Sequence, residues 1–120
     1  MRLSELAETL ELEIRAAAGC ADREVRGGYA SDLMSDVMAN AEEGDVWVTL
    51  QTHMNIVAVA AMKELAGVIL VKGREPEAET VSKAEEKEVP ILVSRLPAFE
   101  LIGRLYELGI HGQGADAQGA

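Results

Sequence analysis

Apolar residues are arranged in two different patterns along the second half of the chain. Short, almost continuous apolar runs predict strands buried on both faces, and the stretches after them repeat apolar residues at helical spacing. The predicted strands span residues 45–51, 67–72 and 89–94, and the predicted helices span residues 55–65, 76–87 and 97–108. Alternating strands and helices imply parallel pairing with right-handed crossovers. The pattern predicts an α/β fold: a three-layer α/β/α domain with a largely parallel central sheet. Its strands should bury Trp47, Val48, Ile69, Leu70, Ile91 and Leu92.

The first half of the chain carries a weaker form of the same pattern. It predicts a helix over residues 3–10, strands over residues 12–16 and 24–29, and a helix over residues 31–40. Beyond Gly109 the sequence IHGQGADAQGA is small, polar and rich in glycine, which is typical of a flexible segment. We therefore expect one domain over residues 1–109 and a flexible tail over residues 110–120.

Size and charge narrow the possible partners. The chain has 120 residues, enough for one ordinary domain, and a formal net charge of -10. Negative charge repels the phosphate backbone of nucleic acids and anionic lipid surfaces, so we expect neither as a partner. The N-terminal residues lack the basic start and apolar run of a signal peptide. The single cysteine, Cys20, offers no internal disulfide. We expect a cytoplasmic protein.

Catalytic and cofactor motifs do not occur in the expected contexts. The sequence contains neither a P-loop (G-x-x-x-x-G-K followed by Ser or Thr) nor a G-x-S-x-G nucleophile elbow, and Cys20 has no adjacent histidine. No cysteine cluster could hold zinc or an iron–sulfur centre. We therefore expect a protein without catalytic activity, cofactor or metal.

The first candidate ligand site combines Asp22 and Arg23 with Gly27 and Gly28. An arginine offers an anion two parallel hydrogen bonds, and glycines let a ligand approach the backbone closely. The same residues are also explained by a turn, a structural ion pair and tight packing. A second candidate places Asp32 and Asp36 four residues apart on one helix face, where they could hold a hard cation or simply face solvent.

The third candidate follows the predicted central strand at Gln51, Thr52 and His53, joined by residues 72–75 (Lys72, Gly73, Arg74 and Glu75) after the next strand. Ligands of open α/β sheets bind at the carboxyl ends of the strands, where free amides of a helix suit an anion. The alternative is that these residues cap the helix. If there is a ligand site, we expect the first and third candidates to share one crevice and bind an anion.

One predicted helix has no obvious polar face. Residues 56–61 (IVAVAA) are all apolar, so this helix is either buried on both sides or covered by a second subunit. We therefore expect a homo-oligomer, with a dimer as the simplest form.

A family resemblance is carried by the strings DREVRGGYASDLMSDVM and GDVWVTLQTHMNIVAVA and by the run VILVKGREPEAETVSKAEEKEVPILVSRLPAFELIGRL. They resemble the DRTGG domain, with Asp22, Arg23, Gly27 and Gly28 matching the residues of its name in spaced form. The last run is also similar to the N-terminal domain of HPr kinase/phosphorylase. The kinase relatives keep their P-loop in a separate domain, so the resemblance does not imply kinase activity.

The resemblance implies an α/β/α accessory module of the kind fused to CBS domains, phosphotransacetylases and certain inorganic pyrophosphatases. Stand-alone versions tend to be encoded near iron-only hydrogenase subunits, which implies a redox-enzyme partner. The sequence thus favours a regulatory or assembly module that senses a small anionic metabolite or nucleotide. The alternatives are a pure protein-interaction subunit that dimerises and docks on an enzyme, and an enzyme that uses Asp32, Asp36 and His53.

Overall fold

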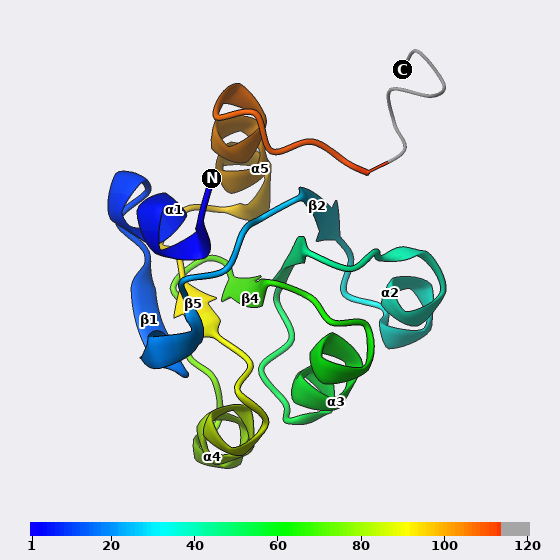
Figure 1. Ribbon diagram of the computed structural model, residues 1–120. Coiled ribbons are helices and arrows are strands. Elements are labelled where there is room, and N and C mark those ends of the chain that lie inside the picture. The colour runs from blue at the N-terminus through cyan, green and yellow to red at the C-terminus, as the bar shows by residue number, and fades with distance from the viewer. Residues whose placement is uncertain (114–120) are drawn as a thin grey trace.

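The computed structural model describes residues 1–113 and contains one five-stranded sheet (Figure 1). The strand order is β1-β5-β4-β3-β2; β1 runs antiparallel to β5, and the other pairs are parallel. The strands are β1 (Glu13–Ala16), β2 (Gly27–Ala30), β3 (Asp45–Thr49), β4 (Gly67–Leu70) and β5 (Ile91–Val93). The helices are α1 (Leu3–Thr9), the 3-10 turn η1 (Ala18–Cys20), α2 (Met34–Asn40), α3 (Asn55–Met62), α4 (Ala78–Lys87) and α5 (Ala98–Glu107).

Side chains of successive strand residues enter opposite layers of the core. Val46 and Val48 of β3 pack with Leu3 of α1 and Leu101 of α5, whereas Trp47 packs into the cluster formed with α2, α3 and α4. Figure 1 shows α1 and α5 on one side of the sheet and α3 and α4 on the other. The expected α/β/α architecture is confirmed.

The three central strands are buried on both faces. Every residue of β3, β4 and β5 is buried, and the six strand residues expected in the core are at most 4% exposed. The indole of Trp47, the largest buried side chain, donates a 2.8 Å hydrogen bond to the carbonyl of Ser31. A polar atom at the edge of the apolar core is thereby satisfied.

Several elements begin later than the sequence pattern predicts. Helix α2 begins at Met34 rather than residue 31, and β2 begins at Gly27 rather than residue 24. Glu24 instead forms an isolated antiparallel bridge with Arg2. Helix α4 begins at Ala78 rather than residue 76, and α5 begins at Ala98 rather than residue 97, with Pro97 as its N-cap.

Residues 110–113 pack against the edge strand β2, in contrast with the expected flexible tail. Ile110 is buried, and the His111 carbonyl accepts a 3.0 Å hydrogen bond from the amide of Gly28. The Gln113 amide group donates to Asp45 at 2.8 Å and to the carbonyl of Glu43 at 2.9 Å. The rest of the expected tail, residues 114–120, lies outside the described residues. Within residues 1–113, no helix has the length and apolarity needed to cross a membrane.

Candidate functional site

The structure separates the residues that were expected to share one crevice. Strand β2 runs parallel to β3, so the residues before β2 lie at the amino edge of the sheet. Arg23 contacts the segments that precede β4 and β5, whereas His53 follows β3 at the carboxyl edge. The expectation of one shared site is therefore wrong, because the direction of β2 places Asp22 and Arg23 at the opposite end of the strands.

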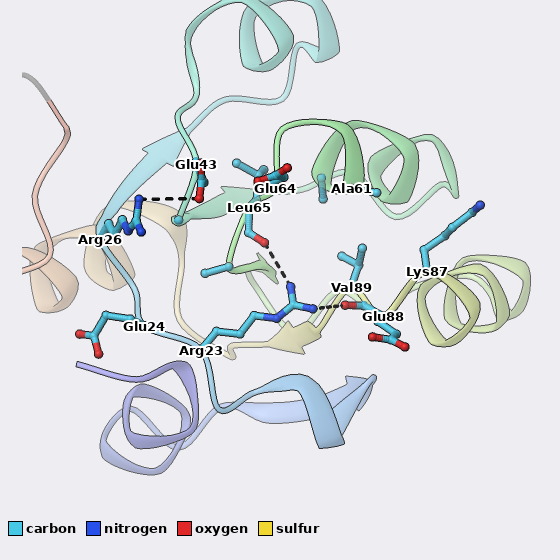
Figure 2. A pocket seen from close by; sticks show the side chains of 13 residues that line it. Arg23, Glu24, Arg26, Glu43, Ala61, Glu64, Leu65, Lys87, Glu88 and Val89 are labelled. Atoms are coloured by element: carbon cyan, nitrogen blue, oxygen red, sulfur yellow. Dashed lines mark hydrogen bonds and ion pairs between the residues drawn. The ribbon is translucent and has the colours of Figure 1, made fainter.

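Arg23 bridges two backbone segments at the amino edge (Figure 2). Its guanidinium donates a 2.6 Å hydrogen bond to the carbonyl of Glu88 and a longer one, 3.4 Å, to the carbonyl of Leu65. Glu88 is the C-cap of α4, where carbonyl groups lack helical partners and carry partial negative charge. A cation at this position therefore has a structural role, through backbone carbonyls rather than through the ion pair that the structural explanation expected.

The amino-edge pocket around Arg23 has a volume of about 530 Å³ but mixed charge. Four glutamates line it together with Arg23, Arg26 and Lys87; they are Glu24, Glu43, Glu64 and Glu88. Arg26 already pairs with Glu43 at 3.8 Å (Figure 2). The N-terminal ammonium group binds Glu24 and lowers the pKa of that carboxyl below its usual range. With its carboxylates outnumbering its cations, this pocket is poorly suited to an anion.

The two glycines of the first candidate lie against the C-terminal segment. A Cβ built on Gly27 would lie 2.6 Å from Cγ of Gln113 and 2.7 Å from the His111 carbonyl oxygen. Gly28 has more room, with Cγ2 of Ile110 at 3.5 Å. Gly27 is therefore explained by close packing. Asp22, the remaining member, forms an exposed 2.8 Å ion pair with Arg2.

The two carboxylates of the second candidate do not share a helix face. Asp32 precedes α2, and its Oδ1 accepts hydrogen bonds of 2.7 Å from the Thr49 hydroxyl and from the Leu50 amide. Asp36 lies in α2 and accepts a 2.8 Å bond from the hydroxyl of Tyr29, which is the main reason its pKa lies below the usual range. Among residues 1–113, no cluster of three or more His, Cys, Asp and Glu side chains could hold a metal ion.

At the carboxyl edge, the segment after β3 makes mostly structural contacts. The side-chain amide of Gln51 donates to the carbonyl of Asp32 at 2.9 Å. The carbonyl of Thr52 accepts a 2.7 Å bond from the buried hydroxyl of Thr80 in α4. The Nδ1 atom of His53 accepts a 3.3 Å bond from the amide of Asn55, the first residue of α3. His53 is therefore explained by satisfying a local backbone group, whereas neither Thr52 nor Asn55 caps the helix, whose N-cap is Met54.

Gly73 joins two loops at the carboxyl edge. It has a φ of 67°, which favours glycine, and its amide donates a 2.8 Å hydrogen bond to the carbonyl of Ser94. The amide of Lys72 donates at 2.8 Å to the carbonyl of Leu96. These bonds hold the loop after β4 against the loop after β5, so the two loops form one surface.

A second cavity, of about 510 Å³, opens at this surface beside the end of β5. Its wall contains the buried Ser94, the exposed Arg95, and Arg104 from α5. Glu11 and Glu13 are its acidic residues, and Glu13 is already paired with Arg15 at 2.7 Å. We call this space the carboxyl-edge cavity. Neither Arg95 nor Arg104 was predicted from the sequence as a site residue, although Arg95 follows the predicted strand over residues 89–94 almost directly, which is a position where ligands bind.

Unpaired cations gather around the carboxyl-edge cavity. Arg95 and Arg104 line it, and Lys72 and Arg74 lie on the loop bonded to its wall. None of the four forms an ion pair with another described residue. Arg15, in contrast, pairs with both Glu13 and Glu75. Its hydrogen bond to Glu75 lowers the pKa of that carboxyl below its usual range. Such a group of cations without ion-pair partners among the described residues stands out in a chain of net charge -10.

The family model of the DRTGG domain matches residues 5–108, which is most of the chain. The chain belongs to the DRTGG-domain family. The match includes both edges of the sheet and all five strands. No curated protein matches this DRTGG domain.

A solved structure that resembles this DRTGG domain is described as the crystal structure of the CBS and DRTGG domains of the regulatory region of Clostridium perfringens pyrophosphatase, complexed with the activator diadenosine tetraphosphate. The two share 14% sequence identity with a TM-score of 0.64. The similarity covers 85% of this chain and 44% of that one, so the chain spans less than half of the solved region. At this identity the likeness establishes the fold.

Proposed function

We propose that this DRTGG domain is a non-catalytic regulatory module that binds a small anionic ligand, a nucleotide or another phosphorylated metabolite, in the carboxyl-edge cavity. The observation that carries the proposal is the set of four cations without ion-pair partners among residues 1–113: Lys72, Arg74, Arg95 and Arg104. Guanidinium groups bind phosphate oxygens through paired, charge-assisted hydrogen bonds. An anionic ligand would also relieve the mutual repulsion of these side chains.

The position of the cavity supports the same proposal. It lies at the carboxyl ends of the parallel strands, where ligands of open α/β sheets bind. The loop after β5 and helix α5 each contribute one arginine to its wall, so both guanidinium groups can act on one ligand. Sequence reasoning selected this edge of the sheet, and the proposal moves the site from β3 to β5.

The wider role follows from the family. The solved relative is a regulatory region that holds a dinucleoside tetraphosphate, which supports a nucleotide-sensing role here. The missing catalytic motifs support a role without chemistry. We further propose a cytoplasmic location, from the sequence, and a redox enzyme of the iron-only hydrogenase system as the regulated partner. The choice of partner rests on the family resemblance alone.

Isothermal titration calorimetry tests the ligand proposal. Diadenosine tetraphosphate and ATP are titrated into the protein, with adenosine as a ligand that has the base but no phosphate. Binding should require the phosphates and should weaken as salt is raised. Arg95→Gln and Arg104→Gln should each weaken it about tenfold, corresponding to about 1.4 kcal/mol for one charge-assisted contact.

A matched control is Arg26→Gln, which removes the same charge at the amino edge. It should leave the affinity unchanged. Equal losses in all three variants would indicate a nonspecific charge effect and would contradict the proposed site. No heat and no rise in melting temperature with any phosphate ligand would instead favour the pure interaction subunit.

A further inference from the structure

Helix α5 exposes an apolar ridge on the face that points away from the sheet. Its inner residues, Leu101 and Leu105, are buried in the core. On the outside, Phe99 is 88% exposed, Tyr106 59% and Ile102 38%. These three side chains, at positions i, i+3 and i+7, form what we call the α5 ridge. The ring of Tyr106 stacks on His111, with 4.1 Å between the ring centroids, so the described chain covers one end of the ridge and leaves Phe99 the most exposed. Burying such aromatic surface is a strong driving force for association.

An apolar groove lies between α3 and α4. Its volume is about 470 Å³. The floor comes from α3 and the residue before it, and its apolar residues are Met54, Val57, Ala58, Ala61 and Met62. The groove is hollow because two of these residues are alanines, whose side chains are too short to fill it. We call it the α3–α4 groove. The all-apolar helix of the sequence analysis is thus buried on one side by the domain and open on the other.

The α5 ridge and the α3–α4 groove carry complementary charges. Glu100 and Glu107 lie on α5 along one side of the ridge. Lys83 and Lys87 of α4 line one wall of the groove, and Lys83 also pairs with Glu86 at 3.2 Å, so Lys87 is the cation without an ion-pair partner among the described residues. An apolar helix face with an acidic flank suits an apolar groove with a basic wall, which is a recurrent mode of helix recognition. Gly103 lies between Phe99 and Tyr106, and a residue without a side chain lets another molecule approach the helix backbone closely. No atom lies within 4 Å of a Cβ built there, so packing inside the described domain does not require a glycine.

From these surfaces we infer that the α5 ridge of one copy docks into the α3–α4 groove of a second copy. The ridge and the groove lie on opposite faces of the sheet (Figure 1), so a copy that offers its ridge keeps its own groove free. The contact is therefore heterologous, and it extends head to tail until a ring closes or the chain of subunits ends. This goes beyond the proposed ligand site, which uses other residues.

The test measures mass by light scattering at about 0.15 M salt, where repulsion between acidic subunits is screened. The unmodified protein should exceed the monomer mass of 12.8 kDa as concentration rises to about 100 µM. Phe99→Glu removes the ridge and Ala58→Glu blocks the groove; both sites are exposed, so circular dichroism and thermal melting should confirm folding. Each variant alone should be a monomer.

The decisive step mixes the two variants. Phe99→Glu retains an intact groove, and Ala58→Glu retains an intact ridge, so their mixture should form a dimer of twice the monomer mass and no larger species. As a control, Leu33→Glu changes another exposed apolar residue, 64% exposed, and should leave assembly unchanged. A monomeric unmodified protein, a single variant that still assembles, or a mixture that stays monomeric would each overturn the inference.

Discussion

Replacing Gly27 by alanine should separate residues 110–113, the C-terminal segment, from the edge strand β2. The new Cβ would lie 2.6 Å from Gln113 Cγ, 2.7 Å from the His111 carbonyl oxygen and 2.9 Å from Oδ1 of Asp45. The Gln113 side chain can rotate, but the carbonyl belongs to the backbone. Asp45 is only 1% exposed and is held by the amide of Glu42 at 2.8 Å. The C-terminal segment must therefore shift.

The expected cost comes from overpacking and lost contacts. Overpacking lowers the free energy of unfolding by about 1–3 kcal/mol. Replacing glycine by alanine raises it by about 0.4–1 kcal/mol, because the unfolded chain has less conformational entropy. We expect a net loss of about 1–2 kcal/mol in the free energy of unfolding. It would reflect weakening of the Gly28–His111 bond, the Gln113 contacts and the burial of Ile110.

Urea denaturation measures this loss, and Gly28→Ala provides the matched control. At Gly28 the new Cβ would find its nearest neighbour at 3.5 Å, an ordinary van der Waals contact, so stability should change by less than about 0.5 kcal/mol. Amide hydrogen exchange at Gly28 should also accelerate in Gly27→Ala, since its acceptor moves away. Equal stability of the two variants would refute the packing explanation for Gly27.

Three further changes test individual contacts. Arg23→Met should cost about 1–2 kcal/mol in urea denaturation, because two backbone carbonyls lose their donor; an unchanged midpoint would count against the structural role. Trp47→Phe should cost about 2–4 kcal/mol, through a cavity and loss of the bond to Ser31. Tyr29→Phe should raise the Asp36 pKa toward its ordinary value, measured by NMR titration. Because the folded pKa of Asp36 is depressed, the stabilisation that Tyr29 confers should be present at pH 7 and disappear as pH falls below about 4.

The second half of the fold was predictable from sequence because burial there follows a simple rule. Residues 67–70 and 91–93 are flanked by helices on both faces of the sheet, so nearly every strand position is apolar. The first half was less predictable because side chains and loops set its boundaries. Asp32, for example, bonds to the amide of Leu50 and lies outside α2, which begins two residues later.

The candidate site depended on a direction that local patterns do not encode. A sequence pattern identifies a strand but not whether it runs parallel or antiparallel to its neighbour. Which edge of the sheet Arg23 occupies therefore became clear only from the parallel pairing of β2 with β3. The carboxyl edge could be predicted as the place of a ligand site, because β3 and β4 are expected to run parallel in an α/β fold. Arg104 could not be, because it reaches the carboxyl-edge cavity from α5, ten residues after Ser94 in the chain and through tertiary packing.

The antiparallel edge strand β1 has a consequence for how the chain folds during synthesis. Glu13 pairs with Val93, so β1 cannot complete its hydrogen bonds until β5 has left the ribosome. Until then the parallel core of β3 and β4 can form from neighbouring segments, and residues 1–4 can pair with residues 21–25, whereas β1 has no partner. A nascent chain stalled before residue 91 would thus expose β1 as an unpaired strand, and residues 13–16 would be among the last to be protected from a protease.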